Sequence, residues 1–366
     1  MSFSAWANES SELMANLRSR MVSLTKNASL IKSYSNHTQS YIYDQALAII
    51  AFSHQKDLKS ARQLMKGLEQ IQRDDGSYYF SYYLDGTSPY PAEGDKRYAG
   101  AIAWVAIAGS HYQQQFNSKE FEPGTEKVLS YLQSQLQSTK DSHLALRFAP
   151  TDLAGTVWNE FETAALEHNL DALAAFRNYE KVTGKKIWKK EIEGLKNFSL
   201  SLWDEERGHF WSGMDLRSSK INRDEFYLDN QSWSTLALEE KDLKRVNLVS
   251  ALGANCDNLQ VNHDGITGFM DRKPANRKSE FQFVWSEGTA GQILALERAR
   301  ALEQKACPKI KNEKLLSEIK KMQKSDGGIS YATKGNDPDF SSASSVAGTT
   351  WYYFALNNFN PFHLVE

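Results

Sequence analysis

The stretch IQRDDGSYYFSY, residues 71–82, recurs in outline at residues 322–333 as MQKSDGGISYAT. Each copy ends a helical run with glutamine, reaches Asp-Gly three residues later and continues into small and aromatic residues. A looser copy, SLWDEERGHFWSG at 201–213, places Phe210 and Trp211 after Gly208. Glycine just past a helix supplies the left-handed residue that ends it. The copies therefore predict similar helix ends in distant parts of the chain.

One-sided helices precede two of these turns. The segment 60–72 places Leu64, Leu68 and Ile71 at helical spacing. The segments 126–136 and 313–323 have the same apolar spacing, with lysine and glutamate on the opposite face. These patterns predict amphipathic helices that cover a core with one face.

A second kind of helix alternates with the first and is apolar on most sides, which predicts burial on most sides. Six segments have this character: 41–52, 98–109, 168–176, 229–238, 287–296 and 346–356. Markers in these segments (Asp44, Gly100, His168, Asp229, Glu287 and Ala347) are separated by 56, 68, 61, 58 and 60 residues. One sixth of the 366-residue chain is 61 residues. The chain therefore reads as six tandem helical hairpins.

A hairpin of this kind cannot bury its apolar face alone, so neighbouring hairpins must stack. Six that close into a ring predict an all-α, (α/α)6 toroid with an inner and an outer helix layer, formed by residues 1–366 as a single domain. An open solenoid or two separate domains are the alternatives.

Composition limits the possible partners. The 43 Lys and Arg nearly balance the 45 Asp and Glu, and no basic block occurs, so we expect no nucleic-acid partner. No apolar run reaches the ~18 residues of a membrane span. The N-terminal sequence lacks the features of a signal peptide. We expect a soluble, monomeric protein, cytoplasmic as written, or periplasmic or secreted if a signal peptide has been trimmed.

Two cysteines, Cys256 and Cys307, belong to no Cys-x-x-Cys pair, so the sequence gives no support for a zinc site. Two buried thiols are the favoured interpretation, with one disulfide as the alternative. No histidine spacing suggests a metal, and no Gly-rich phosphate loop suggests a nucleotide, so we expect neither metal nor cofactor.

The six hairpins with Asp-Gly-aromatic turns resemble the (α/α)6 barrels of the six-hairpin glycosidase superfamily. The segments YDQALAIIAF and EHNLDALAAF are also similar to inner helices of N-acylglucosamine 2-epimerase-like sugar isomerases. Terpenoid cyclases and prenyltransferases use similar turns, but the RDDG at 73–76 falls in the turn and fits their Asp-rich motif poorly. The resemblance implies a carbohydrate-active enzyme.

The buried helices begin with polar and aromatic residues that would line the mouth of a central cavity. Aromatic rings stack on sugar C–H faces, and carboxylates and amides bind hydroxyls, so this set suits a carbohydrate in a concave site. Helix capping is the alternative for such residues, notably Asp229 and Ser286. The predicted substrate-binding residues are Tyr43, Glu93, Arg97, Trp158, His168, Asp229, Trp233, Trp285 and Trp351.

Glycoside hydrolysis needs two carboxyl groups, one of which holds a proton near neutral pH. Glu287, next to Trp285 and Gly288, is the first predicted catalytic residue, and Asp44 or Glu167 the second, with Glu93 in reserve. The resemblance implies an inverting mechanism.

Two other functions stay open. A sugar 2-epimerase or isomerase would use a histidine on an inner helix, and the EHNLDA motif offers His168, although no second histidine occupies such a position. A noncatalytic glycan-binding barrel would bind sugar without turnover.

Overall fold

The computed structural model describes residues 3–86, 96–149, 162–274, 282–334 and 340–365, with side chains from Asn8 onward. Its contacts divide the chain into two compact units, and each is described by itself. The first unit comprises Met1–Asn16, Ser201–Ser212 and Ile221–Asn360, and the second comprises Leu17–Leu200, Gly213–Lys220 and Pro361–Glu366. The single-domain toroid predicted from the sequence stays a prediction.

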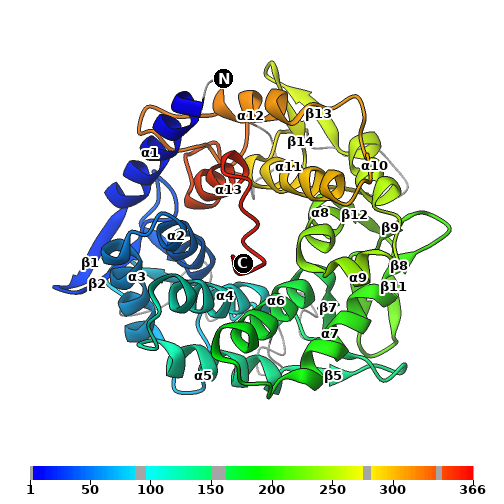
Figure 1. The fold of residues 1–366 in the computed structure, drawn as a ribbon, viewed down its shortest axis with the longest axis horizontal. Coiled ribbons are helices and arrows are strands. Elements are labelled where there is room, and N and C mark those ends of the chain that lie inside the picture. The colour runs from blue at the N-terminus through cyan, green and yellow to red at the C-terminus, as the bar shows by residue number, and fades with distance from the viewer. Residues whose placement is uncertain (1–2, 87–95, 150–161, 275–281, 335–339, 366) are drawn as a thin grey trace. The chain divides into compact units, whose positions relative to one another are not determined.

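Three buried helices form the centre of the second unit: α2 (Ile42–His54), α4 (Ala99–Phe116) and α6 (Leu166–Thr183). They lie side by side with α4 in the middle (Figure 1). Each begins within two residues of a predicted buried segment, so these predictions are confirmed. The amphipathic helices α3 (Leu58–Ile71) and α5 (Glu122–Ser134) pack on α2 and α4, and α7 (Lys189–Ser201) follows α6.

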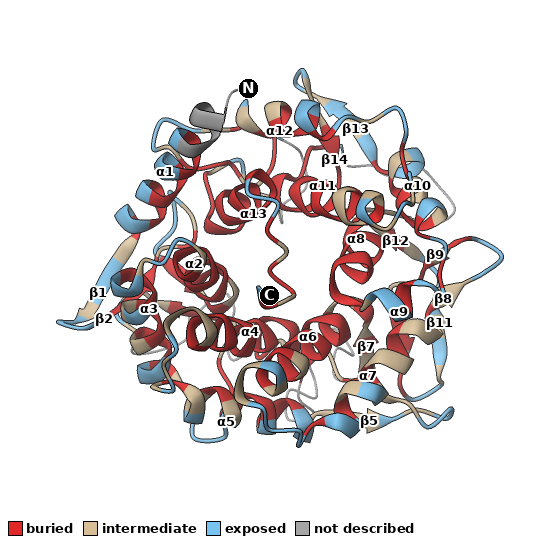
Figure 2. Cartoon of the chain, in the orientation of Figure 1, coloured by how far each residue is buried: buried red, intermediate tan, exposed pale blue. Residues whose placement is uncertain are grey.

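The first unit repeats this arrangement. Its buried helices are α8 (Leu228–Ala237), α11 (Ser286–Ala301) and α13 (Val346–Leu356), and α11 contacts both others. Their neighbours are α10 (Leu248–Asn258), α12 (Asn312–Lys320), the short α9 (Glu240–Leu243) and α1 (Phe3–Ser19), whose last residues belong to the second unit. Figure 2 shows the buried helices as almost uniformly red, whereas the amphipathic ones are mixed. Apolar periodicity in the sequence predicted this difference.

Short antiparallel ladders lead directly into three buried helices, a feature that the sequence did not reveal. They are β3 (Gln39–Tyr41) with β4 (Ser81–Tyr83), β7 (Thr163–Ala165) with β10 (Gly213–Asp215), and β12 (Glu225–Tyr227) with β15 (Arg272–Pro274). The last residue of each entering strand immediately precedes a helix, so the ladders fix where α2, α6 and α8 begin.

The remaining strands are also short. They are β1 (Met21–Thr25), β2 (Ala28–Ile31), β5 (Leu136–Ser138), β6 (Leu144–Leu146), β8 (Trp203–Asp204), β9 (His209–Phe210), β11 (Lys220–Asn222), β13 (Gln260–His263) and β14 (Ile266–Phe269). β11 extends the β7–β10 ladder, and β1–β2, β5–β6, β8–β9 and β13–β14 are antiparallel pairs. Among the described residues, no helix is both long enough and apolar enough to cross a membrane.

The repeated Gln-x-x-Asp-Gly sequence forms the same turn in both units. In the second unit the N–H of Gly76 donates to the Arg73 carbonyl (2.9 Å), and in the first unit Gly327 donates to Lys324 (2.9 Å). Both glycines are left-handed, with φ of +86° and +84°. The prediction that they end the helix itself was wrong, because α3 closes at Gln72 in an extended conformation. The glycine instead serves a tight turn after the helix.

The side chains of the motif explain why it recurs. The Gln72 amide donates to the Gly76 carbonyl (3.3 Å), as Gln323 donates to Gly327 (2.8 Å). The aspartate carboxylate accepts the N–H two residues later, at 3.0 Å in both copies. The spacing of glutamine, aspartate and glycine is therefore a requirement of one locally hydrogen-bonded turn.

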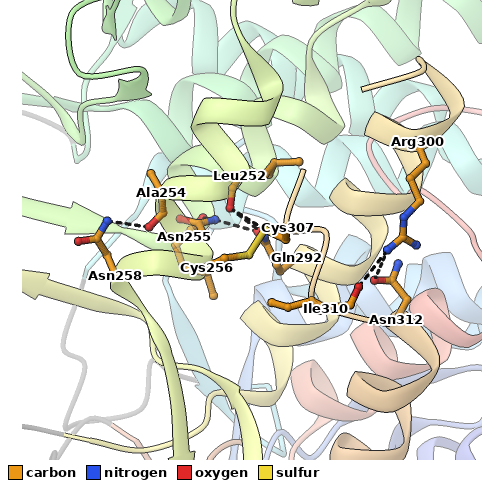
Figure 3. Close-up of a disulfide and its surroundings, with 11 residues drawn as sticks. Leu252, Ala254, Asn255, Cys256, Asn258, Gln292, Arg300, Cys307, Ile310 and Asn312 are labelled. Atoms are coloured by element: carbon orange, nitrogen blue, oxygen red, sulfur yellow. Dashed lines mark hydrogen bonds between the residues drawn. A yellow bond between two sulfur atoms is a disulfide. The ribbon is translucent and has the colours of Figure 1, made fainter. Parts of the chain in front are cut away.

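Cys256 and Cys307 form a disulfide, so the interpretation as two buried thiols was wrong. Cys256 lies near the end of α10, and Cys307 follows α11 with a left-handed φ of +49° (Figure 3). The fold brings their Cα atoms to 6.2 Å, within the range of a disulfide. Their sequence separation of 51 residues concealed this proximity.

Candidate active site

Amide side chains in the first turns of the buried helices hold neighbouring strands. Asn169 of α6 accepts the N–H of Leu146 (2.7 Å) and donates to its carbonyl (3.2 Å). Gln231 of α8 makes the same pair of bonds with Phe210, both 2.8 Å. These polar residues are therefore structural, and polarity at a helix start does not by itself identify a ligand-binding residue.

Asp229 has a different environment at the start of α8. Tyr227 occupies the N-cap position and makes no side-chain capping bond, so Asp229 is not the cap residue that the sequence left open. It lies one position inside the helix and is 8% exposed. The start of α8 is held by the β12–β15 ladder and by the hydrogen bond from the Leu228 N–H to the Asp271 carbonyl (2.8 Å). Asp229 is therefore not required as a helix cap.

A second buried carboxylate, Asp271, stands beside Asp229 and is 7% exposed. Burial, followed by the charge of Asp271, raises the pKa of Asp229 to about 7. The backbone N–H of Asn230 and the charge of Arg272 act in the opposite direction. Burial disfavours a charged carboxylate, and a like charge nearby disfavours it further. Asp229 is therefore a carboxyl group that retains its proton close to neutral pH.

Arg272 connects this pair to the ladder. Its Nη1 lies 2.7 Å from Oδ2 of Asp271, and its Nε lies 3.8 Å from Oε1 of Glu225. The Tyr227 hydroxyl donates to Glu225, and burial together with this carboxylate raises the pKa of Tyr227. Because Tyr227 pairs with Arg272 in the ladder, the network is fixed by backbone register.

Glu287 lies in the first turn of α11 and is 2% exposed. The starts of α11 and α8 are in contact, since a Cβ on Gly288 would come within 2.6 Å of Leu228 and 2.2 Å of the Trp285 ring. Trp285 packs edge-on against Tyr331, with ring centroids 6.3 Å apart. Asp229, Asp271 and Glu287 therefore all belong to the helix-start region of the first unit.

Trp233 and Trp351, predicted to bind substrate, are core residues of the same unit. They are 2% and 0% exposed, and their rings stack at 5.6 Å with an interplanar angle of 10°. This placement gives both a packing role, and direct contact with a sugar stays a prediction.

The second unit carries a continuous row of aromatic rings at its helix starts. Successive centroids lie 4.9, 4.8, 5.1 and 4.1 Å apart, mostly in edge-to-face or tilted contact. All but the last ring are half-buried, so part of each faces outward. In order, the row is Tyr41, Phe80, Tyr98, Phe148 and His168.

Asp44 and Tyr43 follow this row into α2. Asp44 is 3% exposed and, as at α8, is not the N-cap residue, because Tyr41 holds that position. Tyr43 makes an edge contact with Trp104 at 5.5 Å. Arg97 is buried, and its Nη1 lies 3.7 Å from Oδ2 of Asp75 in the Asp-Gly turn. The repeated turn therefore contributes a charge to the helix-start region.

His168 is enclosed at the start of α6. Its ring stacks on Phe148, and a Cβ on Gly100 would lie only 2.3 Å from it. Burial lowers the pKa of His168 to about 3, although a backbone hydrogen bond to Phe148 opposes the change. The ring is therefore neutral at physiological pH, and Glu167 beside it is only half-buried.

The remaining site predictions stay open. Glu93 and Trp158 lie outside the described residues. Glu287 belongs to the first unit, whereas Asp44 and Glu167 belong to the second, so their pairing stays a prediction. Within the described ranges, no group of three or more His, Cys, Asp or Glu could hold a metal ion.

Sequence reasoning missed Asp271, Arg272, Phe80 and Phe148. Arg272 is the first residue of β15, and the other three lie just before or after short strands rather than at helix starts. One signal was present: in ITGFMDRK the apolar residues give way abruptly to an Asp-Arg pair. The role of this pair is visible only once β15 is paired with β12, which lies more than 40 residues earlier in the chain.

Several solved structures of sugar enzymes have a similar fold. A D-mannose isomerase matches with a TM-score of 0.74 and 12% identity over 98% of this chain and 97% of its own. A glycosidase in complex with glucose matches with a TM-score of 0.69 and 9% identity, over 98% of this chain and 100% of its own. A GH76 α-mannanase from Bacteroides thetaiotaomicron matches with a TM-score of 0.65 and 11% identity, over 97% of this chain and 95% of its own.

No family model matches the chain, and neither does any curated protein sequence. The structural neighbours confirm the resemblance to the (α/α)6-barrel carbohydrate-active enzymes. At identities near 10%, this likeness shows the fold and leaves the reaction to be argued from the residues.

Proposed function

We propose that this chain is a glycoside hydrolase that cleaves an oligo- or polysaccharide with Asp229 as the general acid. The observation that carries the proposal is the buried Asp229–Asp271 pair, in which Asp229 has a pKa raised to about 7. A glycosidase needs a carboxyl group that remains protonated near neutral pH. Asp229 would give its proton to the glycosidic oxygen as the bond to the anomeric carbon breaks.

The second carboxylate must act at the anomeric carbon. We propose Glu287, which begins the neighbouring helix α11. In the inverting reaction that the sequence resemblance implies, Glu287 would take a proton from water while the resulting hydroxide adds to the anomeric carbon. The proton lost by Asp229 is then balanced by the proton gained by Glu287. Asp44 and Glu167 are proposed as alternatives for this base, in the toroid predicted from the sequence.

The aromatic row of the second unit supports a sugar as the substrate. Its first four rings are half-buried, uncharged Tyr and Phe side chains, which suit the C–H faces of pyranose rings. We propose that Tyr41, Phe80, Tyr98 and Phe148 contact the sugar, and that Arg97 and Asp44 bind its hydroxyls. The chemistry of the first unit and this row are separate arguments for the same substrate class.

The test is a screen of the purified protein against plant, fungal and bacterial oligo- and polysaccharides, with release of reducing ends as the readout. Asp229→Asn and Glu287→Gln should each abolish most of the activity while the circular dichroism spectrum is unchanged. Asp44→Asn and Glu167→Gln decide between the alternative bases. Glu193→Gln, an exposed carboxylate paired with Lys196, is the matched control and should retain full activity.

Full activity in Asp229→Asn would refute this acid. A sugar epimerase or isomerase would instead interconvert free sugars without new reducing ends. No observation at the site favours that function, because His168 is enclosed and its pKa is lowered to about 3. Sugar affinity without any turnover would identify a noncatalytic binding barrel.

A further inference from the structure

Two neighbouring carboxylates that share one proton leave open which of them holds it. Asp229 and Asp271 are both buried and both lie at the α8 start. If the proton divided its time between them, only part of the population would present the acid that catalysis needs. The two carboxylates have different surroundings, because Arg272 contacts Asp271, and this difference decides which of them holds the proton.

Arg272 contacts one member of the pair. Its guanidinium lies 2.7 Å from Oδ2 of Asp271, a carboxylate with 9% of its side chain exposed. An ion pair at this distance favours the charged form of its acid. Asp229 instead has the N–H of Asn230 and a buried position in the first helical turn. Negative charge is therefore better accommodated on Asp271.

The position of Arg272 is itself fixed. Glu225 lies 3.8 Å from its Nε and accepts a hydrogen bond from Tyr227. Glu225 and Tyr227 lie on β12, opposite Pro274 and Arg272 of β15. Among the described residues, Tyr227 on β12 is a titratable neighbour of Asp229, and α10 contributes the uncharged Asn255, which donates to the Leu228 carbonyl (3.0 Å). The charges that act on the pKa of Asp229 are those of Asp271, directly before β15, and of Arg272 in β15.

We propose that Arg272 is a positioning residue that keeps the negative charge of the pair on Asp271, so that the transferable proton resides on Asp229. The proposal rests on the proposed function, in which Asp229 is the acid. Arg272 acts through Asp271 and need not touch the substrate.

The pH profile of kcat/KM distinguishes this role from a purely structural one, because its alkaline limb reports loss of the proton from the free enzyme. Arg272→Gln removes a positive charge, so the last proton of the pair is held more tightly. The alkaline limb should move up by about one pH unit, while the plateau falls because part of the protons now reside on Asp271. Asp271→Asn removes a negative charge and should move the limb down by about one pH unit. Arg272→Lys keeps the charge and should restore the wild-type limb.

Arg300→Gln is the matched control. Arg300 has 35% of its side chain exposed and lies 2.8 Å from Glu297, against 33% and 2.7 Å for Arg272 and Asp271, but it lies at the far end of α11. It should leave the limb unchanged. Equal limbs in wild type, Arg272→Gln and Asp271→Asn, or shifts of both variants in the same direction, would overturn the proposal.

A stability measurement separates failure of this proposal from failure of the proposed function. Arg272→Gln should lower the urea midpoint more at pH 6 than at pH 3, since the ion pair exists only where Asp271 is charged. In an Asp271→Asn background the same substitution should have a small effect that is equal at both pH values. A pH-independent loss in both backgrounds would overturn the role of Arg272 even if glycosides are cleaved. If no glycoside is cleaved, the hydrolase proposal fails and this cycle alone decides whether Arg272 fixes the charge.

Discussion

His168 and Asp229 both lie in the first turn of a buried helix, His168 as the third residue of α6 and Asp229 as the second residue of α8. Both are buried, at 6% and 8% exposure. Burial favours the neutral form of each, lowering the pKa of His168 to about 3 and raising that of Asp229 to about 7. The neutral histidine has no proton to donate as an acid, whereas the neutral aspartic acid does. Burial therefore leaves a neutral ring in one unit and a carboxyl group that keeps its proton near neutral pH in the other.

The largest expected effect tests this contrast in catalysis. Asp229→Asn should lower kcat by about a thousand-fold, since it removes the general acid. His168→Gln should leave kcat within about tenfold of wild type, because the proposed hydrolysis assigns His168 no proton transfer. Single-turnover rates on the best substrate from the screen measure both. A thousand-fold loss in His168→Gln with normal Asp229→Asn activity would reverse the assignment and favour the isomerase.

The disulfide offers a second contrast, because both cysteines of the chain belong to the first unit. Cys256 follows Asn255, which donates to Gln292 (2.8 Å) (Figure 3). Asn255 also donates to the Leu228 carbonyl (3.0 Å). Replacing both cysteines by alanine should lower the free energy of unfolding by about 4 kcal/mol for a loop of this length.

Hydrogen exchange locates this loss. Amides of α10 and of the α8 start should exchange faster in the double alanine variant, while those of α4 and α6 keep the wild-type protection. Uniform acceleration across both units would show that they unfold as one, and would remove the contrast that the disulfide predicts. Unchanged protection of α10 would mean that the bond adds no constraint there.

The sequence revealed the helices better than the site. Apolar periodicity located the six buried helices because burial of a whole helix leaves a strong, local pattern. The ladders left no such pattern, since each strand has only a few residues and its partner lies far along the chain. The polar residues at the helix starts were expected to line a cavity, yet Asn169 and Gln231 there hold strands. Asp271 and Arg272 were missed because only β15 pairing brings them to α8. Local composition cannot distinguish a strand clamp from a catalytic carboxylate.

The two Asp-Gly turns allow a comparison of equal conformations in unequal surroundings. Gly76 and Gly327 share a left-handed φ, which costs alanine about 1 kcal/mol. A Cβ on Gly76 would lie 2.3 Å from the Lys127 carbonyl oxygen, whereas the nearest atoms to one on Gly327 are 3.9 Å away. Gly327→Ala should therefore cost about 1 kcal/mol, and Gly76→Ala about 3 kcal/mol, because backbone must shift as well. Urea denaturation of both variants measures the difference, and equal costs would show that the turn relaxes freely around Lys127.

The smallest expected effect is on the pH dependence of stability. His168 and Asp229 change the free energy of unfolding in opposite directions as the pH rises. The pKa of Asp229 is raised by folding, so its contribution to stability is complete below about pH 4 and is lost as the pH rises towards 7. The pKa of His168 is lowered by folding, so its contribution is complete above about pH 6.5 and is lost as the pH falls towards 3. Between pH 4.5 and 6 each group changes the free energy of unfolding by at most about 1.4 kcal/mol per pH unit, with opposite sign. Relative to wild type, Asp229→Asn should make stability rise more steeply with pH, and His168→Gln should make it fall more steeply. Urea titrations at several pH values measure both slopes, and a change of slope in the same direction for both variants would mean that burial does not act on the two groups as their pKa values indicate.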